Sequence, residues 1–291
     1  MKILISNLNI PIIHYVAQCL ETIKDDNLNI FLWNPQIKSI IDAFDEINPH
    51  VVLLHDSQLD QSFNVICNEF DYKYILMCTK DLDTNLPKAP EAIIPMINPQ
   101  NIFQHYKNKI INVRPVAKIP EIHNAQYTEY MKSDILIDTT HANIDNNIHE
   151  LLDYLTNTYT TKIIGNNTVQ FKQYLGKVSM AERANFIKSA NYFIDIGIVG
   201  DCWDAAYLKV PALSIYPTNG VVLQFNNLTT FNTHLNTLRN NTPVRKEYIK
   251  QCYTNVCDNN TSYHFSAELF SMINEVEIAN RLLKYMKGLE C

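Results

Sequence analysis

The sequence predicts an α/β protein with two domains, each built around a mostly parallel sheet. Short apolar runs alternate with helical patterns through residues 1–113 and again through 134–217, as strands and crossover helices do in such sheets. Between the two series, Arg114–Pro120 is spaced by prolines, which indicates an extended linker. Five of the six glycines lie between Gly165 and Gly220, which indicates close backbone approach in the second series. We therefore place the domains at residues 1–115 and 121–291.

Composition narrows the class of protein. The 291 residues are 46% hydrophobic and 19% charged, with a net charge of −6, which disfavours a protein that holds nucleic acid mainly through its phosphates. Seven cysteines in scattered positions are typical of reduced thiols in an intracellular protein. The sequence has no apolar run of about 18 residues and begins directly with a strand pattern. We expect a cytoplasmic protein without a transmembrane segment.

The first series predicts a sheet with polar residues along one rim. Strands are expected at 2–6, 29–33, 51–54, 74–78, 92–96 and 110–113, and helices at 11–24, 36–48 and 61–69. Ligands of open α/β sheets bind beyond the carboxyl ends of the strands. The residues expected near that rim are Ser6, Asn7, Asn9, His14, His55, Asp56 and Thr79. Any one of them taken singly is more often a cap or turn residue than a catalyst, so their shared edge is the informative feature.

The second series repeats the α/β pattern. Strands are expected at 134–138, 161–164, 169–175, 192–196 and 212–216, and helices at 147–154, 179–190, 202–208, 235–240 and 244–256. Ser179 and Glu182 form a capping-box pattern at the start of one of these helices. A long final helix is expected over 265–287, and we expect it to pack near the junction of the two domains.

The stretch 194–217 predicts an anion site. It contains a strand, a loop with Gly197 and Gly200, a helix from Cys202 and a second strand. Free N–H groups at a helix start and the glycines before it favour a phosphate, and Asp204, one turn into the helix, could accept hydrogen bonds from ribose hydroxyls. The alternative is a tight turn in which Asp204 only complements the helix dipole.

Four motifs of the second half resemble the nucleotide-sugar half of GT-B glycosyltransferases. They are Lys162-Ile163-Ile164-Gly165-Asn166, Gln173-Tyr174-Leu175-Gly176-Lys177-Val178-Ser179, Lys188-Ser189-Ala190-Asn191-Tyr192-Phe193-Ile194, and Trp203-Asp204-Ala205-Ala206-Tyr207-Leu208-Lys209-Val210-Pro211. The tail, with Arg245, Ile249 and Asn260–His264, is similar to the CgeB-like branch, and the C-terminal half as a whole to glycosyltransferase family 4. The resemblance covers residues 134–287, whereas the first half matches only in architecture. It implies two Rossmann-like domains in a GT-B arrangement.

The resemblance implies a donor site in the second domain for a UDP-, GDP- or ADP-linked sugar. Lys177 and Val178 would flank the base, Asp204 would bind the ribose, and the Gly200, Asp201 and Cys202 amides would receive the diphosphate. Gly165 ends a strand at the same site. The paired glutamates of many retaining members are absent, since Ile196 stands in the first position. The Arg and Lys that usually hold the phosphates are absent too, so we expect His141, Lys177 or Arg183 to compensate.

The expected activity is glycosyl transfer without a metal or other cofactor. His14, His55 and Asp56 are candidates for the general base of an inverting transfer, and Ser6, Asn7 and Asn9 for the acceptor-side loop. A polysaccharide, a protein, a small molecule or a modified base in DNA stays open as acceptor, and so does the oligomeric state. The last of these acceptors is discouraged by the acidic composition.

Other classes of protein remain alternatives. Asp81-Leu82-Asp83 follows a strand, as the metal-binding motif of GT-A glycosyltransferases does, but so short a match arises often by chance. A Rossmann dehydrogenase is disfavoured because no glycine fingerprint follows the first strand. A sugar-nucleotide epimerase of GT-B shape would act without an acceptor. A catalytically inactive binding or assembly protein would bind a nucleotide without turnover, or bind none.

Overall fold

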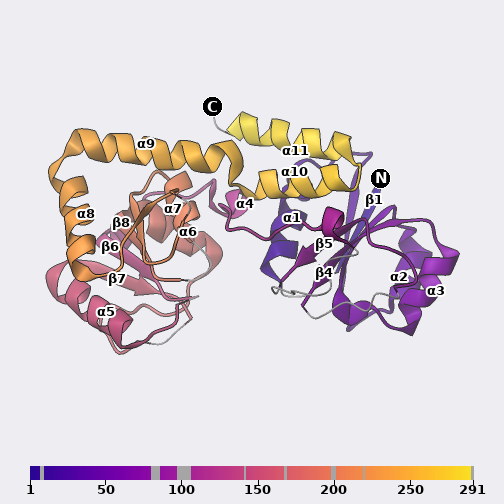
Figure 1. Cartoon of the computed structure of the whole chain (residues 1–291), viewed down its shortest axis with the longest axis horizontal. Coiled ribbons are helices and arrows are strands. Elements are labelled where there is room, and N and C mark those ends of the chain that lie inside the picture. The colour runs from indigo at the N-terminus through magenta and orange to yellow at the C-terminus, as the bar shows by residue number, and fades with distance from the viewer. Residues whose placement is uncertain are drawn as a thin grey trace. The chain divides into compact units, whose positions relative to one another are not determined.

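The computed structural model divides the chain into two compact units, which are described separately (Figure 1). Unit 1 comprises residues 1–114 and 262–291, and unit 2 comprises residues 115–261. The structure describes residues 1–6, 10–79, 86–96, 106–140, 142–166, 169–197, 201–218 and 220–289. One boundary between the units lies between Arg114 and Pro115, at the start of the proline-spaced stretch.

Unit 1 contains a five-stranded parallel sheet in the order β2-β1-β3-β4-β5. Its strands are β1 (Lys2–Ser6), β2 (Asn29–Trp33), β3 (Val51–His55), β4 (Lys73–Cys78) and β5 (Ala92–Pro95). The chain moves from β1 to β2 on one side and then crosses back to β3 on the other. The carboxyl ends of β1 and β3 therefore flank the topological switch point, where α/β sheets bind ligands.

The helices of unit 1 cover both faces of the sheet. Pro11 begins α1 (Pro11–Thr22), which buries Ile12, Ile13, Val16 and Leu20 at the helical spacing of an amphipathic stripe. On the other face, α2 (Ile40–Ile47) and α3 (Gln61–Glu69) pack together around Phe44 and Phe63. Ser39 caps α2, so the helix begins four residues later than the pattern at Gln36 predicts, and residues 34–38 form a turn.

The C-terminal residues complete unit 1 with two helices. These are α10 (Ser262–Met272) and α11 (Val276–Leu289), and α10 packs on α1. The prediction of one long helix is wrong because Asn274 takes a left-handed conformation with φ 60°. The Glu275 N–H then bonds to the Phe270 carbonyl at 2.8 Å, which is the Schellman ending of a helix. Residues 262–291 thus lie in unit 1, whereas the predicted division assigns them to the second domain.

Unit 2 contains a second five-stranded parallel sheet, in the order β10-β9-β8-β6-β7. Its strands are β6 (Ser133–Asp138), β7 (Thr161–Ile164), β8 (Ala190–Asp195), β9 (Ala212–Ser214) and the short β10 (Leu223–Gln224). The switch point lies between β6 and β8, which pair in register so that Asp138 stands opposite Asp195. Residues 110–113 and 169–175 form only isolated bridges, at Ile110 and Tyr174, instead of the strands predicted there.

Helices cover both faces of this sheet as well (Figure 1). On one face, α5 (Asn146–Thr158) and α8 (Leu228–Asn240) bury Leu152, Leu155, Phe231 and Leu235 in a core with β6 and β8. The helices α6 (Met180–Ser189) and α7 (Cys202–Tyr207) contact each other, and α9 (Thr242–Asn259) packs on α7 and α8. The short α4 (Ile119–Ile122) follows the boundary and packs on α6.

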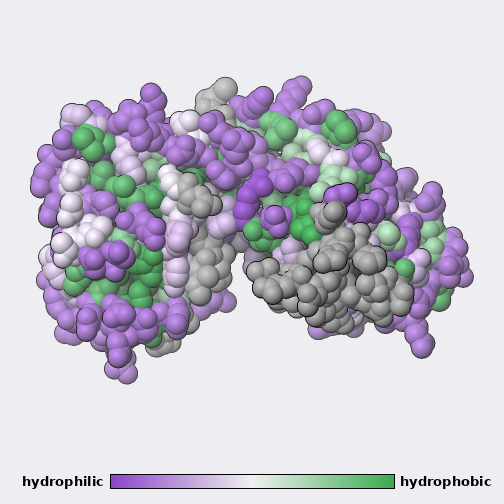
Figure 2. Space-filling model, viewed as in Figure 1, coloured by the Kyte–Doolittle hydropathy of each residue, from purple (hydrophilic) through white to green (hydrophobic). Residues whose placement is uncertain are grey.

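The face of the molecule seen in Figure 2 is largely hydrophilic, and the apolar residues on it lie in areas bordered by hydrophilic residues. Six cysteines of the described ranges are free thiols. No helix among the residues that the structure describes is long and apolar enough to cross a membrane.

Candidate functional site

The carboxyl ends of β6 and β7 approach each other closely at Gly165. A Cβ atom on Gly165 would lie 2.6 Å from both the Thr139 Oγ1 and the Thr140 amide nitrogen, and the glycine has φ +127°. Its N–H donates to the Gly176 carbonyl at 3.0 Å, and its carbonyl accepts from the Tyr174 hydroxyl at 2.9 Å. Only glycine fits this position. Because its backbone polar groups are used inside the protein, Gly165 shapes the site instead of binding the donor through them.

Asp195 fixes the chain on both sides of the glycine loop. Its carboxylate, at the end of β8, accepts from the Gly197 amide and from the Cys202 amide, both at 3.0 Å. The Cys202 amide, which we expected to receive a diphosphate, is therefore occupied. Burial, and after it the charge of Asp201, raise the pKa of Asp195 to about 6, although the hydrogen bonds with Cys202 and Gly197 act to lower it.

Arg183 of α6 joins the end of β6 to the start of α7. Its Nε donates to the Asp138 Oδ2 at 2.6 Å, and its Nη1 donates to the Asp204 Oδ2 at 2.7 Å. Nη2 lies 2.9 Å from the Asp201 Oδ1, without hydrogen-bond geometry. Burial would lower the pKa of the guanidinium, but the charges of Asp201, Asp204 and Asp138 raise it well above its ordinary value.

Lys118 is the second cation of this cluster. Its Nζ lies 2.8 Å from the Asp201 Oδ1 and 3.6 Å from the Asp204 Oδ2. Its backbone N–H donates to the Asp204 Oδ1 at 2.9 Å. The exposed fractions of Asp204, Arg183 and Lys118 are only 1%, 5% and 7%. These residues with Asp138 and Asp201 form one buried ion-pair network.

This network gives Asp204 a different role from the expected one. Both carboxylate oxygens are engaged by Arg183 and Lys118, so a ribose hydroxyl would have to displace a buried ion pair to reach them. Asp201 and Arg183 are occupied in the same way. In this structure Asp201, Asp204 and Arg183 contact one another under the strand ends, and the Cys202 amide is held by Asp195; the donor contacts expected of these four residues stay predictions.

Two residues predicted to contact the donor, Lys177 and Val178, lie beyond this framework. Lys177 is exposed and Val178 is half-buried, directly after Gly176, which has φ +87°. Ser179 caps α6, with its hydroxyl accepting from the Glu182 amide at 3.3 Å and its amide donating to the Glu182 carboxylate at 2.9 Å. The capping-box prediction is thus confirmed, and it fixes the rim to α6. Among the residues described, Lys177 is a cation outside the buried network.

In unit 1 the rim predicted from the first series comes together at the switch point. The Gln58 side-chain amide donates to the Ser6 hydroxyl at 2.5 Å. Asp56 is buried and accepts from the Thr79 amide at 2.6 Å. Its Oδ1 lies 3.1 Å from the Nδ1 of His55. Ser6, His55, Asp56 and Thr79 therefore form one connected group across β1, β3 and β4.

The tautomer of His55 decides what this group can do. Its Nδ1 lies 2.8 Å from the Ser57 hydroxyl and 3.1 Å from both the Ser57 amide and the Asp56 Oδ1. Nδ1 accepts when it bonds to the Ser57 amide, and it donates when it bonds to Asp56 or gives its proton to the Ser57 hydroxyl. A neutral ring whose Nδ1 donates leaves Nε2 unprotonated and able to take up a proton.

His14 is exposed on α1, where its Nε2 lies 3.0 Å from the side-chain amide of Gln18. Six predicted residues lie outside the described part of the chain: Asn7, Asn9, Asp81, Asp83, His141 and Gly200.

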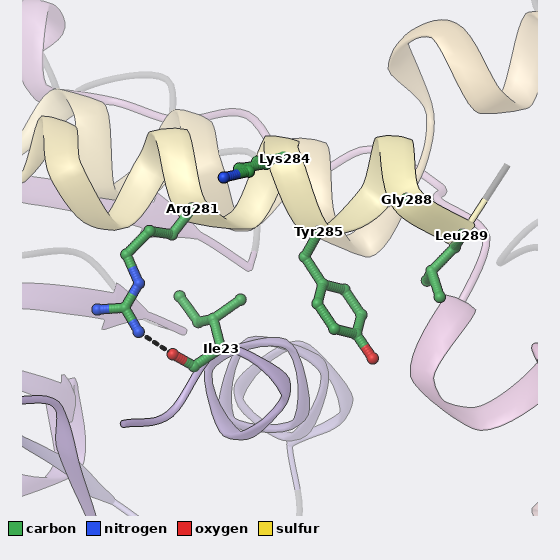
Figure 3. Close-up of a pocket in the computed structure, with 6 residues that line it drawn as sticks. All are labelled: Ile23, Arg281, Lys284, Tyr285, Gly288 and Leu289. Atoms are coloured by element: carbon green, nitrogen blue, oxygen red, sulfur yellow. Dashed lines mark hydrogen bonds between the residues drawn. The ribbon is translucent and has the colours of Figure 1, made fainter. Parts of the chain in front are cut away.

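A pocket of about 430 Å³ lies elsewhere on unit 1 (Figure 3). It is lined by Ile23, just after α1, and by residues of α11, with Arg281 pointing to the Ile23 carbonyl. Because α1 runs back from the carboxyl end of β1, Ile23 lies toward the opposite edge of the sheet from Ser6. Within the described ranges, no group of three or more His, Cys, Asp or Glu side chains is arranged to hold a metal ion.

The fold is that of the GT-B class, as comparison with solved structures shows. A structure from Listeria monocytogenes assigned as a UDP-N-acetylglucosamine 2-epimerase matches with a TM-score of 0.53 at 10% identity, over 99% of this chain and 96% of that one. The S. aureus MnaA structure with UDP matches with a TM-score of 0.51 at 12% identity, over 95% and 98%. The spinosyn forosaminyltransferase SpnP matches with a TM-score of 0.50 at 11% identity, over 99% of each chain. No family model matches the sequence, and no curated protein does.

Proposed function

We propose that this protein is a glycosyltransferase that moves a sugar from a nucleotide-sugar donor to an acceptor hydroxyl. The His55–Asp56 pair carries the proposal, because it stands at the carboxyl edge of the unit 1 sheet beside the switch point. A half-buried histidine held by a buried carboxylate is the arrangement of a general base. The GT-B fold, which SpnP also has, supports the same class of reaction.

The proposed transfer is inverting. Asp56 accepts the Nδ1 proton of His55 in a hydrogen bond, and Nε2 removes the proton of the acceptor hydroxyl. The acceptor oxygen forms a bond to the anomeric carbon while the bond from that carbon to the diphosphate breaks. The nucleoside diphosphate leaves with the electron pair, and the proton stays on His55. Asp56 is a positioning residue in this scheme, since the Thr79 amide and hydroxyl hold its carboxylate in place.

We propose that the donor binds at the exposed rim of unit 2, with Lys177 and Val178 beside the nucleotide. Arg183 and Lys118 are engaged with buried carboxylates, so Lys177 is the cation of the described rim that remains to meet the diphosphate charge. Gly200 and His141 stay proposed donor contacts from the resemblance alone. We further propose that the transfer proceeds without a metal, so that activity persists in EDTA.

The test is release of nucleoside diphosphate from a panel of UDP-, GDP- and ADP-sugars with candidate acceptors. We expect His55→Gln to reduce the release at least a hundredfold, as loss of a general base does. His50→Gln is the matched control, because His50 precedes β3 and bonds to the Lys2 amide at the amino edge of the same sheet, and it should leave release unchanged. Full activity in His55→Gln would refute this assignment of the base.

A second candidate is a sugar-nucleotide epimerase. It is favoured by the fold shared with the structure assigned as a UDP-N-acetylglucosamine 2-epimerase. An epimerase would convert the sugar of UDP-N-acetylglucosamine with no acceptor present, and NMR of the sugar protons would detect the product. Binding of UDP without either reaction would instead indicate the non-catalytic alternative.

A further inference from the structure

The chain passes between the two units twice, and the two passages meet inside unit 2. The first passage precedes Pro115 and the second follows Thr261. Ala117 pairs with Thr261 in a parallel bridge, and the Ala117 N–H donates to the Asn260 carbonyl at 2.8 Å. Asn260 ends α9, where its own N–H bonds to the Val256 carbonyl. The two connecting segments, 115–118 and 259–261, are therefore tied together.

Lys118 binds this pair of segments to the start of α7. Its backbone N–H and its Nζ both reach α7 carboxylates, with 2.9 Å to the Asp204 Oδ1 and 2.8 Å to the Asp201 Oδ1. Because the main chain itself takes part, α7 cannot shift without moving residue 118 or breaking a buried contact. A buried charge that loses its partner is costly in free energy, so the two connecting segments are held firmly to α7.

Carboxylates at the ends of two strands of the unit 2 sheet also hold the start of α7 in place. Asp195 accepts from the Cys202 amide, and Arg183 bridges Asp204 to Asp138 at the end of β6. The strand ends, the start of α7 and the two connecting segments are thereby joined through contacts of buried polar groups. None of these contacts was predicted from the sequence.

We propose that Lys118 is a positioning residue that couples the two connecting segments to the carboxyl edge of the unit 2 sheet. Under this proposal, a disturbance of the connecting segments changes the order of α7, and a ligand that orders the edge stiffens the connecting segments in return. The consequence for catalysis rests on the proposed function, because it assumes a donor at this edge. The coupling itself does not.

Hydrogen exchange of the full chain without ligand tests the coupling. The disturbance is Asn260→Gly, which loosens the backbone beside the Ala117 bond and removes no group of the buried network. It is applied to the wild type and to Lys118→Met/Asp201→Asn, which removes one cation and one anion together. The control background is Lys132→Met/Glu129→Gln, an exposed pair at 3.1 Å in the same unit.

In the wild type and in the control background, Asn260→Gly should raise exchange of peptides covering 115–122 and also 201–208, by about tenfold. In Lys118→Met/Asp201→Asn, which leaves the backbone bond from residue 118 to Asp204 in place, it should raise exchange at 115–122 as before and at 201–208 clearly less. The proposal is overturned if the effect on 201–208 is equal in all three backgrounds, or is missing from the wild type. If the double variant does not fold, Lys118→Gln replaces it as the test background. A smaller effect on 201–208 in that background supports the proposal, and an equal effect overturns it. Failure of UDP to bind would count against the proposed function and would leave the exchange result unchanged.

Discussion

The role of Asp204 can be decided by one substitution, Asp204→Asn. The variant keeps the shape of the side chain but places an amide where a carboxylate meets the Arg183 Nη1 at 2.7 Å and the Lys118 N–H at 2.9 Å. Removing one partner of a buried ion pair costs about 3–5 kcal/mol. Arg183 keeps Asp138 and Asp201 as partners, so we expect the lower end, about 3 kcal/mol of unfolding free energy.

The assay is urea unfolding followed by circular dichroism, with UDP binding measured separately by calorimetry. The matched control is Glu129→Gln, which breaks the exposed pair with Lys132 in the same unit and should leave the unfolding midpoint unchanged. If Asp204 instead binds a ribose, the variant would unfold like the wild type and lose about 1–3 kcal/mol of UDP affinity. Unchanged stability would refute the structural role described above.

Three further changes test other parts of unit 2. Gly165→Ala should lower the unfolding free energy by about 2–5 kcal/mol, because its Cβ would strike Thr139 and Thr140 in a strained backbone; an unchanged melting temperature would contradict this. The raised pKa of Asp195 makes the folded state bind its proton at higher pH than the unfolded state, so stability falls as pH rises from about 4 to about 6, by about 3 kcal/mol. Asp195→Asn should abolish that slope in urea titrations. Ser179→Ala should cost about 1 kcal/mol through the lost cap, which thermal unfolding would detect.

The sheets of both units were predictable because their strands are nearly continuous apolar runs. Capping chemistry was equally visible, as at Ser179, where the hydroxyl and Glu182 lie at the required spacing. The break at Asn274 was not, because the apolar period continues across it and the left-handed residue is an asparagine instead of a glycine. Residues 169–175 have the composition of a strand, yet only Tyr174 pairs with the sheet.

Candidate site residues were predicted well where they follow strands and poorly where they depend on contacts across the fold. The order of strands puts His55 and Asp56 at the rim, and the structure adds Thr79 as a partner. The network around Asp204 joins α4, α6, α7 and β6, which no local pattern reveals. One signal was available: β6 and β8 both end in Ile-Asp, and a carboxylate at the end of a buried strand needs a buried partner.

Lys209 follows α7 in a left-handed conformation, with φ 61°. The Val210 N–H bonds to the Ala205 carbonyl at 2.9 Å, so α7 ends in a Schellman motif that glycine would satisfy with less strain. The lysine instead places its Nζ 4.3 Å from the centre of the Tyr253 ring on α9, a favourable cation–π contact.

Unit 1 is built from two separate segments of the chain, residues 1–114 and 262–291, and this affects the order in which the two units are completed during synthesis. Unit 2 is a continuous segment and has all of its residues once Thr261 has left the ribosome, whereas unit 1 still lacks α10 and α11. Until they emerge, α1 has no cover on the side where Cys19 meets Ser262 and where Thr22 meets Tyr263. Of the two units, the one whose residues begin earlier in this chain is therefore completed later.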